Sequence, residues 1–304
     1  MLTVTLLGTG AAVPSVDRNV AALAVEREGE TILFDCGEGT QRQMMRYGVS
    51  FAFREIFFTH YHADHLLGVT GLLRTMGLQD RAAPVTLYGP RGAQRILGAA
   101  AGLGIERNRF DVEIVEVAAG QTLQRGDYDI VPFETDHRAD TIGYVLVEHT
   151  RLGRFNPERA RELGIPEGPL WGRIHKGETI ELPDGRRITP ADLVGEPRRG
   201  RKFVYTGDTR PCATVVAAAA GADLLVHEAT FGEEERERAI ETGHSTAAQA
   251  AEVARQAGVR RLVLTHVSPR YTRDAPELLA EAKAVFPETL IGRDGLSIDV
   301  PFAD

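Results

Sequence analysis

The chain has 304 residues, 43% of them hydrophobic and 26% charged, which is enough to bury the core of one large domain or two modest ones. Its net charge of −8 is not that of a protein covered with cations for nucleic-acid binding, and Cys36 and Cys212 provide neither a disulfide framework nor zinc-finger spacing. No apolar run approaches the ~18 residues that span a membrane, and the N-terminus is typical of a strand rather than a signal peptide, so we expect a cytoplasmic protein.

The first part of the chain predicts short strands with one short helix. Strands are predicted over 2–6, 22–25, 31–34 and 56–58, and a helix over 41–46. The composition of residues 27–30 predicts a hairpin, and residues 35–39 form a tight turn rich in glycine.

A cluster of potential metal ligands, His-Tyr-His-Ala-Asp-His, follows directly at residues 60–65. Residues two apart in an extended segment point the same way, so His60 and His62 can hold one ion together. A helix predicted over 66–76 would direct Asp64 and His65 toward a second ion nearby. Four chelating side chains in six positions favour a metal site over a coincidental run of histidines, and imidazole with carboxylate suits zinc, with Mn²⁺ as an alternative.

Strands and helices then recur along the chain. Strands are predicted over 85–88, 112–117, 128–131 and 143–147, and a helix over 91–103. After the middle of the chain, strands are predicted over 203–206, 223–226 and 262–265, and a helix over 246–256 that begins with the capping box of Thr246 and Gln249. This mixed order predicts an α/β fold with layered sheets.

Residues 150–202 interrupt this pattern. Gly and Pro recur there, the apolar periodicity is weak, and the segment is too long for an ordinary connection. Residues 151–202 hold twelve Lys and Arg against eight Asp and Glu, so the rest of the chain carries a charge of −12. We expect an inserted module between residues 1–149 and 203–304, with a floppy surface insertion as the alternative.

Further potential ligands stand where predicted strands end. His137, Asp208 and His266 each follow such a strand, and strands deliver side chains rigidly to one edge of a sheet. Together with the first cluster they complete two sites. We predict that one ion is held by His60, His62 and His137, that the other is held by Asp64, His65 and His266, and that Asp208 bridges them.

Two divalent ions ~4 Å apart suit the hydrolysis of a phosphodiester. The leaving oxygen then needs a proton donor, and His244 stands at a helix start where a substrate could reach it. Glu228 could hydrogen-bond His244 and keep it protonated. The alternative is a histidine in a capping region without a chemical role.

Several segments resemble the ribonuclease Z family, the metallo-β-lactamase-fold endonucleases that mature the 3′ end of transfer RNA. The ligand cluster alone would also fit β-lactamases, glyoxalase-type thioesterases or small phosphodiesterases. The more specific segments are Leu6–Pro14, Phe34–Gln41, His227–Thr230, Gly243–Thr246 and His266–Tyr271.

The resemblance implies a four-layer αββα sandwich with a flexible arm at residues 150–202. It implies two Zn²⁺ per subunit and removal of the 3′ trailer from precursor tRNA, which leaves a 3′-hydroxyl on the tRNA and a 5′-phosphate on the trailer. It also implies a homodimer in which the arm of one subunit holds the tRNA elbow while the other subunit cuts. A basic arm on an acidic body agrees with this, because phosphates attract Lys and Arg irrespective of base sequence.

Carried onto this chain, the family motifs imply roles for individual residues. Asp64 would be the proton acceptor, and His244 with Glu228 would assist the leaving oxygen. Residues implied to contact tRNA are Arg18, Asn19, Gly168, Pro169, Arg270 and Tyr271. Val16 departs from the family pattern P-x-K-x-R-N, where Lys is usual, and this bears on whether tRNA that already carries CCA is rejected.

Two other functions fit part of the pattern. A small-molecule phosphodiesterase would use the same ligands, but it needs no distant basic clamp. A zinc-stabilised RNA-binding protein would close its metal sites without an open position, which a bridging Asp208 and a His244–Glu228 pair argue against.

Overall fold

The computed structural model describes residues 1–105 and 108–303, which form two compact units. The first unit comprises residues 1–147 and 201–301, and the second comprises residues 148–200 and 302–304. Arg201 and Lys202 lie in the first unit, which leaves ten Lys and Arg and nine Asp and Glu in residues 148–200. None of the helices in the described part of the chain has both the length and the apolar character that crossing a bilayer requires.

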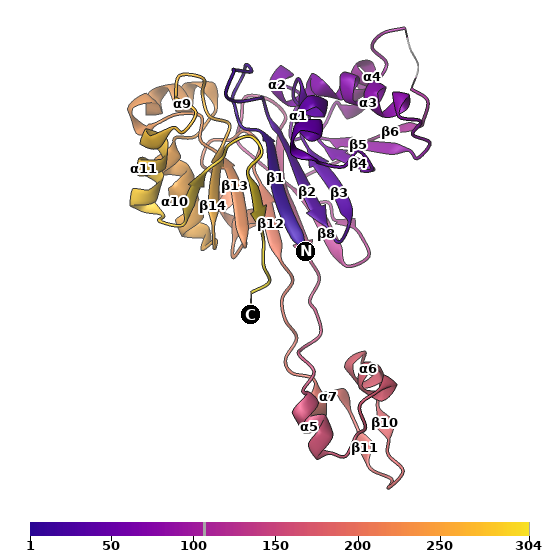
Figure 1. Ribbon diagram of the computed structural model, residues 1–304. Coiled ribbons are helices and arrows are strands. Elements are labelled where there is room, and N and C mark those ends of the chain that lie inside the picture. The colour runs from indigo at the N-terminus through magenta and orange to yellow at the C-terminus, as the bar shows by residue number, and fades with distance from the viewer. Residues whose placement is uncertain (106–107, 304) are drawn as a thin grey trace. The chain divides into compact units, whose positions relative to one another are not determined.

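Two mixed sheets form the centre of the first unit (Figure 1). In spatial order, the first sheet contains β16 (Ser297–Asp299), β1 (Leu2–Gly8), β2 (Ala22–Arg27), β3 (Glu30–Phe34), β4 (Glu55–Phe57), β5 (Val85–Gly89) and β6 (Val112–Glu116). The second sheet contains β15 (Thr289–Ile291), β14 (Leu262–Thr265), β13 (Leu224–Glu228), β12 (Lys202–Tyr205), β9 (Ile142–Glu148), β8 (Tyr128–Glu134) and β7 (Leu123–Gln124). The runs β3 to β6 and β12 to β15 are parallel.

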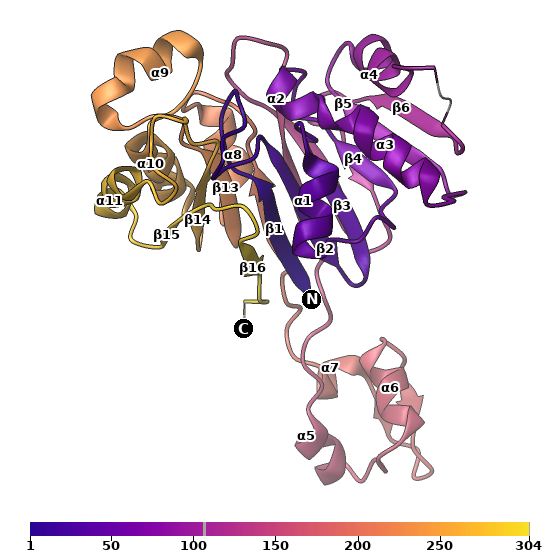
Figure 2. The same cartoon turned by 45° about the horizontal axis from the view of Figure 1, so that its top comes forward.

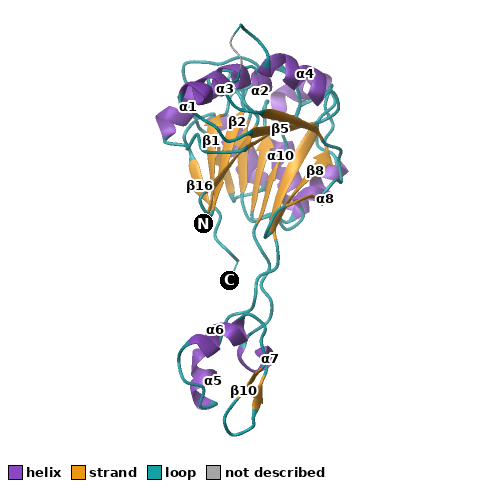
Figure 3. Cartoon of the chain, turned by 90° about the vertical axis from the view of Figure 1, so that its right-hand side faces the viewer, coloured by secondary structure: helices purple, strands orange, loops and turns teal. Residues whose placement is uncertain are grey.

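Helices cover the outer face of each sheet, so the first unit has four layers (Figure 3). The first sheet is covered by α1 (Thr40–Tyr47), α3 (Gly68–Leu78) and α4 (Ala93–Ala101), and the second by α8 (Ala213–Ala219), α10 (Ala247–Ala257) and α11 (Pro276–Val285). Two short helices, α2 (Ala63–Leu66) and α9 (Arg236–Thr242), lie at the same end of the sheets, and a 3₁₀ turn at Glu233–Glu235 precedes α9 (Figure 2).

The apolar core between the two sheets explains why they pack face to face. Phe34, Phe57, Tyr144 and Phe203 are fully buried there, with their ring centroids 5.3 to 5.9 Å apart. Side chains alternate across a strand, so the same strands that supply this cluster also supply the clusters beneath the helices. The four-layer α/β fold expected from the sequence is confirmed.

Most sequence-predicted elements of this unit are present, with one instructive difference. The helix expected over 66–76 begins slightly later, as α3, and a separate short helix, α2, precedes it. A Cβ atom added to Gly68 would lie 1.9 Å from the carbonyl oxygen of Gly37, so the turn after β3 packs directly against the start of α3. Asp64 and His65 therefore lie on the short helix α2 rather than on α3.

The second unit has an apolar core of its own. It contains α5 (Pro157–Glu162), α6 (Pro169–His175), α7 (Pro190–Leu193) and the hairpin of β10 (Ile180–Glu181) and β11 (Arg187–Ile188). The buried side chains are Ala160, Ile165, Ile174, Ile180, Leu182, Ile188 and Leu193. These elements are only two to seven residues long, which is too short for a clear apolar period to appear in the sequence.

Candidate metal centre

The candidate site lies where strands of both sheets end. Ligands of parallel strands gather at the edge formed by the carboxyl ends, where loops carry the chemistry of such sheets. His60 follows β4, and Asp208 and His266 follow β12 and β14 of the other sheet. Gly207, whose φ is +60°, packs against the Thr59 side chain at the point where the two sheets meet. Neither sheet alone supplies the whole site.

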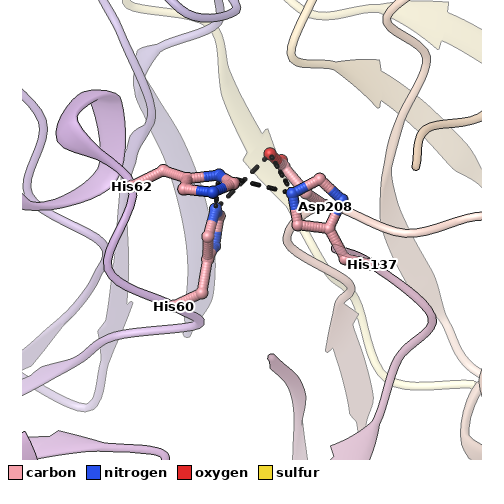
Figure 4. A group of neighbouring side chains, drawn as sticks. All are labelled: His60, His62, His137 and Asp208. Atoms are coloured by element: carbon pink, nitrogen blue, oxygen red, sulfur yellow. Dashed lines mark hydrogen bonds and ion pairs between the residues drawn. The ribbon is translucent and has the colours of Figure 1, made fainter. Parts of the chain in front are cut away.

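The first group of ligands consists of His60, His62, His137 and Asp208, whose polar atoms face one another (Figure 4). The Nδ1 of His62 lies 3.0 Å from the Nε2 of His60 and 3.3 Å from the Nε2 of His137. The Oδ2 of Asp208 lies 3.6 Å from the Nε2 of His60 and 3.9 Å from the Nε2 of His137. One ligand atom from each of the four lies within 4.8 Å of the others.

The second group consists of Asp64, His65 and His266, and Asp208 faces it with its other oxygen. The Nε2 atoms of His65 and His266 lie 3.3 Å apart, and the Oδ2 of Asp64 lies 3.2 Å from the Nε2 of His266. The Oδ1 of Asp208 lies 3.4 Å from both of these Nε2 atoms. The two oxygens of Asp208 therefore face different ligand groups, which is the arrangement required of a bridging carboxylate.

The chemistry of this donor set fits divalent metal ions. The Oδ1 of Asp208 is buried and accepts no hydrogen bond from the described residues. Burial lowers the pKa of His60, His62 and His137, which favours the neutral imidazoles that bind a metal. Burial would raise the pKa of Asp208, but the charges of His266 and His65 hold it well below its usual range. Burying these polar groups together costs free energy, which a shared cation would offset.

Three of the imidazoles are held by hydrogen bonds to the ring nitrogen that faces away from the centre. The Nδ1 of His137 donates to the carbonyl of Gly243 over 2.6 Å, and the Nδ1 of His65 binds Asp35 over 2.7 Å. The Nδ1 of His266 lies 2.9 Å from the hydroxyl of Thr230. These contacts leave Nε2 of His65, His137 and His266 to point into the centre. His266 itself adopts a left-handed φ of +55°, a costly conformation for a residue with a side chain.

Asp35 was not among the sequence-predicted site residues, although it follows β3 just as the ligands follow their strands. It is fully buried, with a left-handed φ of +55°. Its carboxylate accepts hydrogen bonds from the backbone N–H of Thr59 and the hydroxyl of Tyr205, each 2.8 Å long, besides the contact with His65. Asp35 therefore links both sheets beneath the ligands and sets the orientation of His65.

Replacing Asp35 with Asn is expected to weaken metal binding by about 10- to 100-fold, because an amide cannot accept all of these hydrogen bonds. Competition with a chromophoric chelator measures the affinity. Glu38→Gln is the matched control, because Glu38 is an exposed carboxylate in the same turn. Equal affinities of the two variants would show that Asp35 does not orient the ligands.

His244 and Glu228 form the pair that the sequence predicted. The Nδ1 of His244 lies 2.7 Å from the Oε1 of Glu228, which is fully buried at the end of β13. The other carboxylate oxygen accepts from the hydroxyl of Thr230 over 2.7 Å. Burial lowers the pKa of His244, but the charge and hydrogen bond of Glu228 outweigh it and raise that pKa to about 9. Glu228 therefore favours the protonated form of His244, next to the candidate metal ligands.

Arg18 and Asn19 lie in the loop between β1 and β2. Arg18 is buried, and its guanidinium donates to the hydroxyl of Thr9, the carbonyl of Gly292 and the carbonyl of Arg273 over 2.6 to 2.7 Å. These contacts fix the loop from the inside, so the Arg18 side chain supports it rather than facing solvent. Asn19 lines a cavity of about 550 Å³ on the outside of the same loop.

The remaining residues implied to contact tRNA lie in two different places. Gly168 and Pro169 are exposed at the start of α6 in the second unit. Arg270 and Tyr271 follow His266 in the first unit, where both contact Glu235, at 3.2 and 2.7 Å respectively. The structure thus places them on separate units, and a role in tRNA binding stays a prediction for all four.

Comparison with known proteins places this geometry in a family. A model described as Beta-lactamase superfamily domain matches residues 172–267, and one described as Anti-Pycsar protein Apyc1 matches residues 2–150. Ribonuclease Z of Gemmatimonas aurantiaca is 60% identical over 100% of this chain and 97% of its own length. The chain belongs to the ribonuclease Z family. Ribonuclease Z of Myxococcus xanthus is 50% identical over 100% of this chain and 99% of its own length.

A solved structure agrees with this assignment to the ribonuclease Z family. The crystal structure of human tRNase Z, short form, matches with a TM-score of 0.70 at 28% identity, covering 99% of this chain and 100% of that chain. The resemblance and the metallo-β-lactamase fold expected from the sequence are thereby confirmed. A ribonuclease Z with this fold and these His and Asp groups uses a divalent metal.

A cavity of about 370 Å³ opens over the metal centre of this ribonuclease Z family member. His62, Asp64, Asp208, His244 and His266 line its floor and wall. The cavity therefore brings His244 and members of both ligand groups to one space, which a phosphate group could enter.

Proposed function

We propose that the chain is the endonuclease that removes the 3′ trailer from precursor tRNA. The observation that carries this proposal is Asp208, whose two oxygens face two separate groups of candidate metal ligands beside the His244–Glu228 pair. The relatives named ribonuclease Z, which align along the full length of the chain, support the choice of RNA as substrate.

The residues around the cavity have different roles in the proposed reaction. Divalent ions, when bound, lower the pKa of a water molecule and neutralise charge that develops on the phosphate. Asp64, which also accepts the backbone N–H of Ala12 over 2.8 Å, is proposed to accept the proton of that water. His244 donates its proton to the departing 3′ oxygen of the tRNA, and Glu228 holds it in place. The tRNA then ends in a 3′-hydroxyl, and the trailer begins with a 5′-phosphate.

The proposal is tested by incubating the protein with a precursor tRNA, with and without a chelator, and mapping both new ends. We expect one cut at the 3′ side of the tRNA, a 3′-hydroxyl product, and loss of cleavage with the chelator that added metal restores. Cleavage of small phosphodiesters without any cut in precursor tRNA would favour a small-molecule phosphodiesterase. Binding without cleavage would favour a zinc-stabilised RNA-binding protein.

Two zinc ions per subunit are the occupancy that the donor set supports best. Five of the seven ligands are imidazoles, which suit zinc, whereas the two carboxylates would also accept Mn²⁺. Metal analysis of protein purified without added metal distinguishes the two ions and gives their number.

The second unit is proposed to hold tRNA away from the cut, and the protein is proposed to act as a homodimer. The two segments at the base of this unit pair in a short antiparallel ladder. The backbone N–H of Gly195 donates to the carbonyl of Arg154 over 2.9 Å, and Phe155 pairs with Val194 in an isolated β-bridge. Joining Arg154 to Gly195 through a tight Asn-Gly turn would therefore remove the whole apolar core of this unit at a natural closure point.

This arm deletion is expected to raise the KM for precursor tRNA by about 100-fold, because the second contact that holds the substrate is lost. Hydrolysis of bis-p-nitrophenyl phosphate should continue, since that substrate needs only the metal centre. Steady-state kinetics on both substrates measure the difference. Parallel loss on both substrates would contradict a role in substrate binding and indicate a role in folding.

The homodimer is tested by mixing the arm-deleted protein with Asp208→Ala protein. If the arm of one subunit serves the metal centre of the other, mixed dimers combine an intact arm with an intact centre, and cleavage of precursor tRNA returns. If the mixture is dissociated and reassociated but does not regain cleavage, the arm of one subunit does not serve the metal centre of the other. Light scattering reports the oligomeric state in the same samples.

A further inference from the structure

Arg238 is a cation on the wall of the cavity over the metal centre, and the proposed reaction gives it no role. It lies on α9, which leads through Gly243 directly to His244. Arg238, Thr242 and His244 line the same cavity as the ligands Asp64 and Asp208. The Arg238 side chain is exposed, so a substrate that enters the cavity can reach it.

Arg236 and Arg270 are paired with carboxylates, whereas Arg238 has no such partner in the described part of the chain. Arg236 pairs with Glu233 at 2.8 Å, and Arg270, the other arginine on the cavity wall, pairs with Glu235 at 3.2 Å. Within residues 1–105 and 108–303, the guanidinium of Arg238 makes no ion pair, and its central carbon lies 5.8 Å from the centroid of the Phe231 ring. Phe231 is itself buried, so the ring positions Arg238 and leaves its donors for a ligand.

We propose that Arg238 binds the first phosphate on the tRNA side of the cut and thereby positions the scissile phosphate over the metal centre. The inference rests on the proposed function. His244 gives its proton to the 3′ oxygen that departs, and that oxygen belongs to the last nucleotide of the mature tRNA. The wall that carries His244 and Arg238 therefore faces the tRNA side, where the next phosphate is the one that precedes this nucleotide.

A guanidinium suits this contact because its planar donors can bind two phosphate oxygens at once. A contact with the backbone carries no base information, so it would serve every precursor tRNA alike. The contact adds a positive charge next to a cavity whose floor is formed by carboxylates and imidazoles. Arg238 is thus a substrate-positioning residue rather than a participant in proton transfer.

The experiment compares Arg238→Ala with Arg236→Ala, a control on the same helix that does not line the cavity. Each protein is assayed on precursor tRNA carrying one neutral methylphosphonate, placed either at the first phosphate on the tRNA side or at the first phosphate on the trailer side. On unmodified substrate we expect Arg238→Ala to lower kcat/KM by about tenfold, and Arg236→Ala to cleave like the wild type.

The modified substrates decide the assignment. Wild type and Arg236→Ala should lose about tenfold on the substrate modified on the tRNA side, whereas Arg238→Ala should lose little further, because its partner charge is already gone. The proposal would be overturned if the methylphosphonate on the tRNA side lowered kcat/KM of Arg238→Ala as much as that of the wild type. It would also be overturned if Arg238→Ala became insensitive only to the methylphosphonate on the trailer side. Wild-type protein that does not cut precursor tRNA would instead refute the proposed function, so the two failures are distinguishable.

Discussion

Replacing Asp208 with Ala is expected to lower kcat for precursor tRNA by at least about 10⁴-fold, because both ligand groups lose their shared carboxylate. The two oxygens face His60 and His137 on one side and His65 and His266 on the other. Removing one side chain therefore weakens both metal sites at once. Binding of tRNA should survive, since the proposed arm contact lies on the other unit.

Three measurements test this outcome separately: cleavage rate, bound metal by elemental analysis, and tRNA affinity by gel shift. Asp140→Ala is the matched control, because Asp140 is an exposed carboxylate in the loop that carries His137. The control should retain metal and cleavage. An Asp208→Ala protein that keeps full turnover would contradict a bridging role, whatever its metal content.

Replacing His244 with Ala should lower kcat for precursor tRNA by about 10²- to 10⁴-fold, the usual contribution of a positioned proton donor. The departing 3′ oxygen is a poor leaving group and needs that proton. The p-nitrophenolate of a small phosphodiester is stable as an anion, so its release should slow far less. The ratio of the two rates therefore isolates proton donation from metal binding.

Glu228→Gln provides the matched comparison for this effect. The variant keeps His244 but removes the charge that raises its pKa, so the rate on precursor tRNA should fall less than with His244→Ala. Glu228 also accepts hydrogen bonds from Thr230 and the backbone of Thr209, so metal content and thermal unfolding must be measured alongside. Equal slowing of both substrates by His244→Ala would exclude a role as the acid for the leaving group.

The sequence could place the ligands because their pattern is local. His60, His62, Asp64 and His65 fall in one short segment, and the others follow strands whose apolar runs are clear. Parallel strands bring such ends to one edge of a sheet, so their meeting could be expected. The pairing of His244 with Glu228 could be predicted on different grounds, because Glu228 ends a strand while His244 stands just before a predicted helix.

Other features depend on contacts that the sequence does not display. Asp35 ends a strand as the ligands do, but only the left-handed turn directs its carboxylate beneath His65 instead of toward an ion. Among the residues that the structure describes, Arg238 has no carboxylate partner, whereas the partner of Arg270 lies 35 residues away in the chain. The expectation that Arg18 contacts tRNA rested on a family motif. A motif does not show burial, and the structure places this guanidinium inside the protein.

The origin of the ligands in both sheets has a consequence for stability. An unfolded chain does not gather side chains from β4, β12 and β14, so metal ions bind the native state in preference and shift the folding equilibrium toward it. A metal ion bound by these groups would also hold the two sheets together at the edge where Gly207 packs against Thr59. Thermal resistance of this enzyme should therefore track the free metal concentration of its surroundings, and a cell that starves of metal would lose the protein itself along with its activity.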